Sequence, residues 1–280
     1  MGNPENLFRT FQWVLAFLHI GTSLALAIYA EIEDKDWKTD VFVDYNAWVG
    51  QENKSCASGD GCFIYTVREK FSDTPLSLIW ATASFSLISG AHHLIAAVMG
   101  NKYLVNYVYT GVNVLRWLDY AGSSAIMFAV ISILFTSPPT ITDLVSAYVL
   151  QFLVIVAGAG SDIAWALSSS RGYSKGLFYT TLVAYTVPWS FLIAQYQIAV
   201  DAHPQTDSCD RQFPAGAKKQ DPPAFVTAAI IGLFATFSLF AIVQGIKIHT
   251  ANKNNRTLLK FEYWFSFLSF VSKISLLGNV

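Results

Sequence analysis

Apolar and polar positions divide the chain into long alternating blocks. Seven blocks are almost wholly apolar, and each has close to the roughly 20 residues that a helix needs to cross a bilayer. The third block is the longest, and we expect it to begin as an exposed helix end near Tyr103. The pattern predicts an all-α membrane protein, a seven-transmembrane helix bundle that forms one domain over residues 1–280. The blocks span Phe11–Ala30, Leu76–Met99, Tyr107–Phe135, Leu144–Leu167, Leu177–Val200, Phe225–Ile246 and Phe261–Leu277.

The composition agrees with a multi-pass protein whose main partner is the lipid bilayer. Hydrophobic residues make up 53% of the chain and charged residues 13%, against about 25% charged residues in soluble domains. The net charge is −1, and no basic patch outside the loops indicates a nucleic-acid partner. The first apolar block is too long for a cleavable signal peptide and lacks a small-residue cleavage pattern.

The distribution of basic residues predicts the orientation. Lysine and arginine in short loops stay on the cytoplasmic side. The long loop over residues 31–74 carries most of the acidic residues and belongs to the other side. We therefore expect a cytoplasmic N-terminus and an extracellular C-terminus in the cell membrane. The basic side collects Arg9, Lys102, Arg171, Lys175, Lys247, Lys253, Arg256 and Lys260.

The extracellular loop after the first helix has the pattern of a β-hairpin. Two strand-like runs, Val41–Val49 and Phe63–Val67, flank a glycine-rich turn that holds Cys56 and Cys62. On the outer side this spacing permits a disulfide, although Cys209 is a third cysteine that could pair with either. A glycosylation sequon begins at Asn53 in the same loop.

Lys273 lies inside the last apolar block, where a charged amine costs about 2.5–3.5 kcal/mol on insertion scales. Two interpretations are open. The side chain extends to the membrane interface, or its amine sits in a dry pocket and condenses with an aldehyde to form a Schiff base.

A polar stripe on the third predicted helix favours the second interpretation. Asn113, Arg116, Asp119 and Ser123 follow each other at helical spacing and share one face. A buried lysine derivative that stays cationic needs a nearby carboxylate, and Asp119 is the best placed. The alternative is a structural ion pair between Arg116 and Asp119 that holds the bundle together.

Further polar and aromatic residues inside the apolar blocks have either a packing role or a role in a site. Ser269 lies one turn before Lys273, and Ser272 directly precedes it. His19, His93 and Ser89 form a possible inward polar cluster, with His92 about 100° away on its helix and less important. We expect Asp162 to have a helix-end or interface role. Pro188 and Trp189 combine a kink with a flat ring that suits a ligand wall.

Two motifs narrow the function. Ser-Phe-Val-Ser-Lys273 resembles the S-x-x-S-K signature of heliorhodopsins, and Arg116-Trp117-Leu-Asp119-Tyr resembles their R-W-x-E-Y. The resemblance covers essentially the whole chain and includes the inverted topology and the hairpin after helix one. It implies all-trans retinal on Lys273 as a Schiff base, with Asp119 as counterion. By the same resemblance, the polar networks around the Schiff base and the inner cavity involve Ser269, His19, His93, Ser89, Asn113, Arg116 and Ser124. We expect the cofactor site also to include Ser272, Ser123, Trp117, Pro188 and Trp189.

The sequence departs from the family at one position, since Asp119 stands where the family usually has glutamate. The carboxylate is shorter by one methylene, which puts the absorption colour and the titration of the counterion in question. The resemblance further implies a homodimer, an unidentified cytoplasmic signalling partner and no enzymatic activity.

The spacing of acids bears on transport. Proton-pumping rhodopsins carry a second carboxylate four residues before the retinal lysine, and many carry a third eleven residues after the counterion. Here these positions are Ser269 and Val130. We therefore expect a light sensor with a slow photocycle. A light-gated or light-driven proton transporter is the first alternative, and a retinal-free membrane protein with a structural Lys273 is the second.

Overall fold

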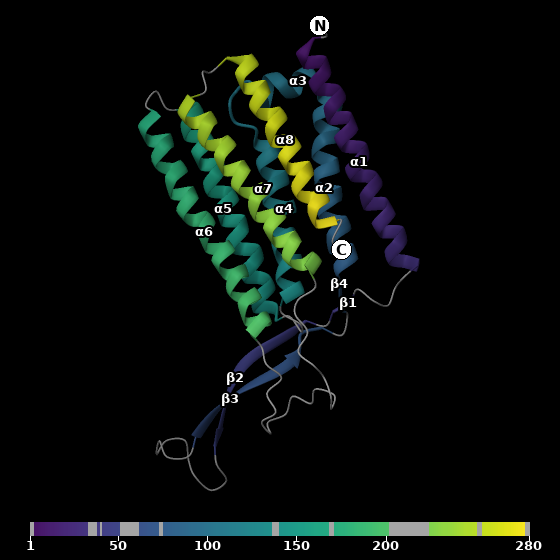
Figure 1. Cartoon of the computed structure of the whole chain (residues 1–280), viewed down its shortest axis with the longest axis vertical. Helices are drawn as coiled ribbons and strands as arrows, with labels where there is room; N and C mark the ends of the chain where they lie inside the picture. Colours follow the sequence, from purple (N-terminus) through teal and green to yellow (C-terminus); the bar gives the residue numbers. More distant parts are fainter. Residues whose placement is uncertain are drawn as a thin grey trace.

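The apolar blocks of the chain fold into a bundle of long, roughly parallel helices, from one end of which a β-hairpin projects (Figure 1). The computed structural model describes residues 3–32, 38–39, 41–50, 62–72, 75–135, 140–167, 171–201, 224–250 and 254–277. Within these residues the long helices are α1 (Pro4–Ile32), α2 (Leu78–Met99), α4 (Val114–Phe135), α5 (Ile141–Leu167), α6 (Arg171–Asp201), α7 (Ala224–Thr250) and α8 (Asn255–Leu277).

Six of the described helices have both the length and the apolar composition of a membrane span. The further helix, α8, contains 23 residues, and the charged residues Lys260, Glu262 and Lys273 interrupt its apolar sequence but not the helix. Its length of about 34 Å at 1.5 Å per residue still suffices for a hydrocarbon core of about 30 Å. The predicted bundle of seven membrane helices is confirmed.

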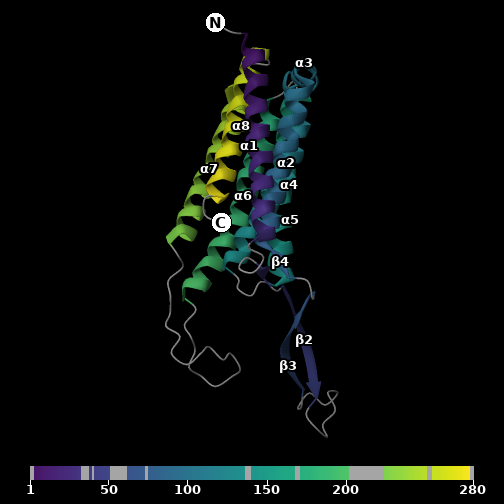
Figure 2. The same ribbon diagram turned by 90° about the vertical axis from the view of Figure 1, so that its right-hand side faces the viewer.

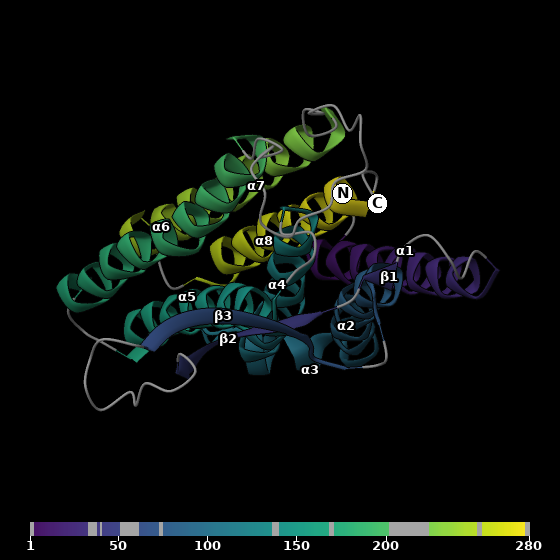
Figure 3. The same ribbon diagram turned by 90° about the horizontal axis from the view of Figure 1, so that it is seen from below.

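The outer faces of the bundle are apolar. Phe17 on α1 and Val183 on α6 are each 69% exposed, and Ile231 on α7 is 64% exposed. Exposed apolar side chains in this number do not suit water and indicate a lipid-facing surface. The spans of α2 and α4 are the most buried of these helices, and α4 lies between α5 and α2 in the view along the bundle (Figure 3).

The expected start of the third span near Tyr103 is wrong. The chain there forms the short helix α3 (Asn101–Tyr103) and a π-helical turn, η2 (Leu104–Val108), before α4 begins at Val114. Tyr103 is buried, with 1% of its surface exposed. The break falls at Gly111, whose φ of +83° suits glycine, and a Cβ atom there would lie 2.5 Å from the Trp165 ring.

The start of α1 is bound to this connecting segment. The Tyr109 hydroxyl donates a hydrogen bond to Glu5 at 2.7 Å. Burial and this hydrogen bond together raise the pKa of Tyr109 above its usual range. On the neighbouring turn of α1, Arg9 donates to the carbonyl of Ala97 in α2 at 2.9 Å. These bonds hold the N-terminal end of α1 against the C-terminal end of α2 and the segment that follows it.

The predicted hairpin is confirmed. Strand β2 (Phe42–Gly50) pairs with β3 (Cys62–Lys70) in antiparallel register, with Phe42 opposite Lys70 and Gly50 opposite Cys62. A second ladder joins β1 (Lys38–Thr39) to β4 (Leu76–Ser77), and two residues a strand are too few for a sequence pattern. The hairpin lies at the end of the bundle away from the N-terminus (Figure 2). Cys56, Cys209 and Asn53 lie outside the described residues.

Two clusters of buried apolar side chains fill the bundle at different levels. One includes Phe85, Phe128 and Trp189 toward the hairpin end. The other includes Phe8 and Trp165 toward the end that carries the N-terminus.

Candidate functional site

Lys273 and Asp119 meet in the middle of the bundle. The Lys273 Nζ atom lies 3.4 and 3.5 Å from the two carboxylate oxygens of Asp119. It also donates a hydrogen bond of 2.6 Å to Ser269, one turn earlier on α8. Lys273 is 2% and Asp119 3% exposed, so the lysine does not extend to the membrane interface.

The Asp119 carboxylate is held by several further groups. Its Oδ1 atom accepts hydrogen bonds from Ser89 at 2.6 Å and from Ser123 at 3.1 Å. Its Oδ2 atom lies 3.5 Å from Nδ1 of His92. The carboxylate is thus oriented by α2 and α4 toward the amine on α8, and hydrogen bonds to the ionised form favour it in a dry site.

An apolar pocket begins at the Lys273 amine. Its walls come from α4, α5, α6, α7 and α8, and they are mainly aromatic and aliphatic, as ligand pockets usually are. Trp117, Ser123, Ser124, Ser269 and Ser272 line it as expected from the sequence. The other lining side chains include Tyr120, Met127, Gln151, Tyr185, Phe237, Phe240, Gln244 and Phe265.

Pro188 and Trp189 do not line this pocket among the described residues. Both are buried in α6. The Trp189 ring packs edge-on against Phe128 with centroids 5.1 Å apart, and it contacts Phe237, which does line the pocket. Trp189 therefore lies one layer behind the wall, because Phe237 and Tyr185 stand in front of it.

The histidines form a separate polar cluster beside the Lys273–Asp119 pair. His93 Nδ1 lies 2.6 Å from the Gln12 side-chain oxygen, and His19 Nδ1 lies 3.4 Å from the Ser86 hydroxyl. The rings of His19 and His93 stack with centroids 5.5 Å apart. Gln12 in turn donates to Ser266 on α8 at 3.1 Å. The cluster joins α1, α2 and α8 on the inside of the bundle.

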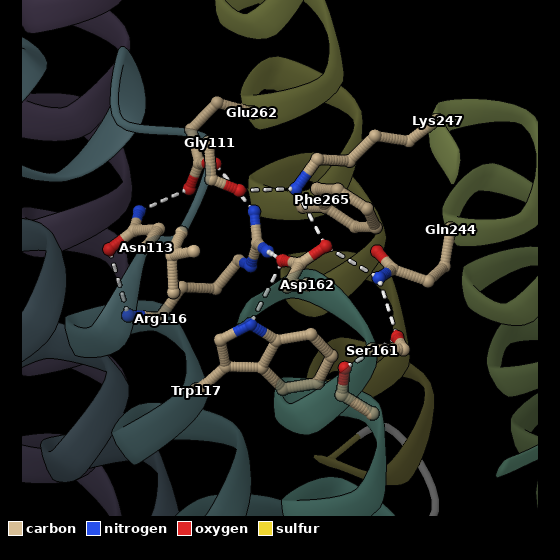
Figure 4. A network of polar contacts seen from close by, with 12 residues as sticks. Gly111, Asn113, Arg116, Trp117, Ser161, Asp162, Gln244, Lys247, Glu262 and Phe265 are labelled. Atoms are coloured by element: carbon tan, nitrogen blue, oxygen red, sulfur yellow. Dashed lines mark hydrogen bonds and ion pairs between the residues drawn. The ribbon is translucent and has the colours of Figure 1, made fainter. Parts of the chain in front are cut away.

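A second group of buried charged side chains forms a polar network between the helices (Figure 4). Arg116 contacts Asp162 at 2.7 Å and Glu262 at 2.5 Å. Lys247 contacts Asp162 at 2.8 Å and donates to the carbonyl of Gly111 at 2.9 Å. We call Arg116, Asp162, Lys247 and Glu262 the ion cluster. It joins α4, α5, α7 and α8.

The ion cluster touches the pocket wall directly. Trp117 Nε1 donates to Asp162 at 3.0 Å, and Gln244 donates to the same carboxylate at 2.7 Å (Figure 4). Both side chains line the pocket. Asn113 donates to Glu262 at 2.6 Å on the far side of the cluster. The shape of the pocket is therefore bound to the position of Asp162.

The geometry corrects several expectations. Asp162 has no exposed surface, so the helix-end or interface role is wrong. Its carboxylate accepts hydrogen bonds from four side chains of α4 and α7, namely Arg116, Trp117, Gln244 and Lys247. Lys247 is 3% exposed and belongs to the ion cluster, although the sequence assigned it to a basic loop. The alternative Arg116–Asp119 pair is not formed, because Arg116 reaches Asp162 and Glu262 instead.

Comparisons with known proteins agree with this architecture. None of the curated proteins compared with the chain matches it. Its fold is similar to the crystal structure of the transmembrane domain of Salpingoeca rosetta rhodopsin phosphodiesterase, with a TM-score of 0.53 and 9% sequence identity over 97% of this chain and 84% of that chain. At this identity the likeness shows the fold alone. The sequence model of the heliorhodopsin family matches residues 8–278.

The chain belongs to the heliorhodopsin family. It is a multi-pass membrane protein of the microbial rhodopsin type, and membership implies a retinal chromophore and a photoreceptor role. The residues of this heliorhodopsin fit such a group. A buried amine lines an apolar pocket, and one carboxylate faces that amine. An apolar aldehyde that forms a protonated Schiff base requires this amine as nucleophile and this carboxylate as counterion.

The sequence analysis does not identify some buried polar residues of this heliorhodopsin, although the spacing of polar residues in α8 indicates one of them. Glu262, Ser266, Ser269 and Lys273 are spaced by four, three and four residues and share one helix face. Glu262 is the second residue of the predicted span Phe261–Leu277, and the sequence analysis gives it no role. Its position on the same helix face as Lys273 indicates that Glu262 is buried inside the bundle.

His92 is the second such case. The sequence gives His92 less importance than His93 in the polar cluster. Among the described residues, however, His92 is the histidine that an ion-pair contact joins to Asp119. Its other ring nitrogen, Nε2, lies 3.0 Å from the Tyr103 hydroxyl. Because Tyr103 lies outside the long helices, the helical pattern gave no hint of this partner.

The ion cluster makes a prediction about stability. In this heliorhodopsin, Asp162→Asn leaves Arg116 and Lys247 with one carboxylate between them inside the bundle. Breaking a buried pair in this way costs about 3–5 kcal/mol. We expect the free energy of unfolding, measured by titration with a denaturing detergent, to fall by that amount.

Asp143→Asn is the matched control. Asp143 lies at the start of the same helix, is partly buried and pairs with Thr140 and Gln195. We expect a loss of only about 1 kcal/mol, the value of an ordinary hydrogen bond. Equal losses for the two variants would contradict the role given to the ion cluster.

Proposed function

We propose that this protein is a light sensor that holds all-trans retinal as a Schiff base on Lys273 and completes a slow photocycle without pumping ions. One observation carries the proposal: the amine of Lys273, which lines an apolar pocket, is buried and lies 3.4 Å from the buried carboxylate of Asp119. Ionisable groups inside membrane helices are costly, and they mark functional sites more often than structural ones.

Bound retinal supplies visible absorption and a light-driven isomerisation. The chain supplies the rest. Asp119 balances a positive charge at the Lys273 nitrogen, and Ser89 and Ser123 fix the direction of its carboxylate. Ser269 accepts a hydrogen bond from the same nitrogen. Trp117, Phe240 and Phe265 close the pocket with apolar surface, which excludes water and preserves the strength of the charge pair.

The absence of a pump relay favours a sensor over a transporter. Ser269, at the first position where pumps carry an acid, is engaged with Lys273. Val130, at the second, packs with Leu78 and Ile133 in an apolar cluster. In the part of the chain that the structure describes, the remaining deeply buried acids, Asp162 and Glu262, are paired with Arg116.

The proposal includes the orientation and the partners. The exposed side chains of Lys102, Arg256 and Lys260 lie at the end that carries the N-terminus, which supports a cytoplasmic N-terminus and an extracellular hairpin. In this arrangement an unidentified signalling partner binds at the cytoplasmic end, and the protein forms a homodimer to which the hairpin contributes.

The test of the chromophore is an absorption spectrum of protein expressed with all-trans retinal. We expect a visible band that is lost when hydroxylamine is added in the light. Lys273→Ala removes the amine and should abolish the band. Lys260→Ala changes an exposed lysine of the same helix and should keep it. A visible band that survives in Lys273→Ala would contradict the proposal.

The test of the counterion is Asp119→Asn. Removing the negative charge 3.4 Å from the Lys273 nitrogen destabilises a positive charge there. We expect the visible band to move to longer wavelength, or to be lost at lower pH than in the unchanged protein. Asp119→Glu keeps the charge and should keep a pigment. A spectrum and a pH titration that Asp119→Asn leaves unchanged would rule out Asp119 as counterion.

The alternative of light-gated or light-driven proton transport is decided by electrical recording. We expect no stationary photocurrent under voltage clamp in cells that carry the pigment. A current that reverses with the proton gradient would indicate a channel, and a current without a gradient would indicate a pump.

A further inference from the structure

Two glycines bound the segment that connects α2 to α4. Among the described residues, Gly100 and Gly111 are the glycines with positive φ, at +53° and +83°. Between them lie the short helix α3 and the π-helical turn η2, and π-helical turns are frequent at functional sites. Hinges are a few residues that absorb large changes of φ and ψ. We call residues 100–111 the connecting segment, and both of its ends suit a hinge.

The backbone hydrogen bonds described for the connecting segment are local. The amides of Tyr109 and Gly111 donate to the carbonyls of Leu104 and Val108, at 2.8 and 3.1 Å. The segment lies at the end of the bundle that carries the N-terminus (Figure 1). It can change its position there without breaking backbone bonds to another helix. Its exposed side chains include Lys102, Val105 and Asn106.

A buried lysine binds this segment to α7. The Lys247 Nζ atom donates to the carbonyl of Gly111 at 2.9 Å and to Oδ1 of Asp162 at 2.8 Å (Figure 4). Lys247 is 3% exposed, and its amine lies 5.4 Å from the centroid of the Trp165 ring. A hydrogen bond from a charged donor is stronger than one from a neutral donor. The hinge at Gly111 is thus bound to the ion cluster.

The Asp162 carboxylate divides its bonds between the pocket wall and the ion cluster. Oδ1 accepts from Gln244 at 2.7 Å and from Lys247 at 2.8 Å. Oδ2 accepts from Trp117 at 3.0 Å and from Arg116 at 2.7 Å. Trp117 and Gln244 line the pocket. Each oxygen therefore joins one donor of the pocket wall to one cation, and a displacement of the wall moves the carboxylate relative to both cations.

The two cations lead to different parts of the molecule. Arg116 contacts Glu262 on α8, the helix that also carries Lys273. Lys247 contacts the connecting segment, which has exposed side chains at the N-terminal end of the bundle. Lys247 is therefore the cation through which the pocket wall can act on an exposed surface.

The other described side-chain partners of the connecting segment are not part of the pocket wall. Tyr103 contacts His92 and Asn113, and Tyr109 donates to Glu5. None of these three partners lines the pocket. The contacts of Tyr103 hold the first part of the segment, so the part after Tyr103 is the one that the Lys247 contact controls.

We propose that Lys247 transmits the shape of the pocket to the connecting segment, and that light releases the carbonyl of Gly111 from it. The inference rests on the proposed function, because isomerisation of a bound chromophore displaces the pocket wall. In the dark, Lys247 bridges Asp162 and Gly111. In the light, Asp162 moves with the wall, and the amine follows the carboxylate because an ion pair is stronger than a bond to a neutral carbonyl.

The consequence is a different surface at the cytoplasmic end. Once its carbonyl is released, the Gly111 hinge lets the part of the segment after Tyr103 move. The exposed side chains of Val105 and Asn106 move with it. Lys247 is a positioning residue, since it acts through Asp162, and a signalling partner at this end meets two different surfaces in the dark and in the light.

The first experiment needs no light. Hydrogen–deuterium exchange of the connecting segment is measured by mass spectrometry on overlapping peptides, in the unchanged protein and in Lys247→Met. We expect the amides of Tyr109 and Gly111 to exchange at least about tenfold faster in Lys247→Met, because a bond from a charged donor contributes at least that factor to local stability. The same exchange rate in both proteins would overturn the proposal.

The control for this comparison is His249→Gln. His249 is another polar residue of α7, but its ring nitrogens lie 3.1 Å from the Tyr179 hydroxyl and 2.8 Å from the carbonyl of Gly245. We expect its connecting segment to exchange as in the unchanged protein. Equally fast exchange in His249→Gln and Lys247→Met would show a general loosening of α7 and would overturn the specific role of Lys247.

A double variant guards against misfolding. Lys247→Met alone leaves Asp162 with one cation in place of two. Adding Asp162→Asn removes one charge of each sign, so that Arg116 and Glu262 remain as a balanced pair. The double variant also lacks the bond to Gly111, and we expect the same fast exchange in the dark. Slow exchange in this variant would contradict the proposal.

The second experiment uses the pigment under continuous light. In the unchanged protein, light should raise the exchange of the Tyr109 and Gly111 amides toward the rate that Lys247→Met has in the dark. In Lys247→Met, light should cause no further increase, because the contact is already absent. A purely structural lysine would give no dependence on light. Exchange that light does not change in the unchanged pigment would overturn the proposal, as would an equal increase in both proteins.

The failure of this inference and that of the proposed function are distinguishable. A protein that gives no visible band with retinal contradicts the proposed function. A normal pigment whose connecting segment exchanges at one rate in dark and light contradicts only the role of Lys247.

Discussion

Charge compensation inside an apolar bundle is the constraint on which this structure depends. The Lys273 amine faces Asp119, and in the ion cluster two cations face two carboxylates. A buried charge without its partner costs several kcal/mol, more than any single apolar contact in the bundle contributes. The helix arrangement must therefore keep these pairs together, and the apolar side chains fill the space around them.

The two charge groups are separate but joined through the pocket wall. Trp117 and Gln244 line the pocket and donate to Asp162, whereas Lys273, which also lines the pocket, faces Asp119. A change of shape in the pocket consequently acts on both groups. Asp162 lies on α5 and bonds to side chains of α4 and α7, so one carboxylate links three of the helices around the pocket.

Much of this was predictable from the sequence, because hydropathy depends on composition along the chain. The helices, the hairpin and the approach of Lys273 to Asp119 followed from apolar block length, strand-like runs and two short motifs. The partners of Arg116 did not follow, since Asp162 and Glu262 are distant in sequence and lay near the apparent ends of apolar blocks. Tyr103 was misplaced for a related reason: one glycine with positive φ ended a run that looked like a continuous helix.

The polar stripe of α8 has a mechanical consequence. Glu262 and Lys273 are eleven residues apart, about 16 Å along the axis, and slightly more than three full turns bring them close to the same edge of the helix. Each is engaged with a different group, Glu262 with Arg116 and Lys273 with Asp119. A rotation of α8 about its axis would disturb both contacts, so the two ion pairs fix the rotational position of the helix at two levels. Apolar contacts are not directional and would fix the rotation of a helix less firmly than these two ion pairs do.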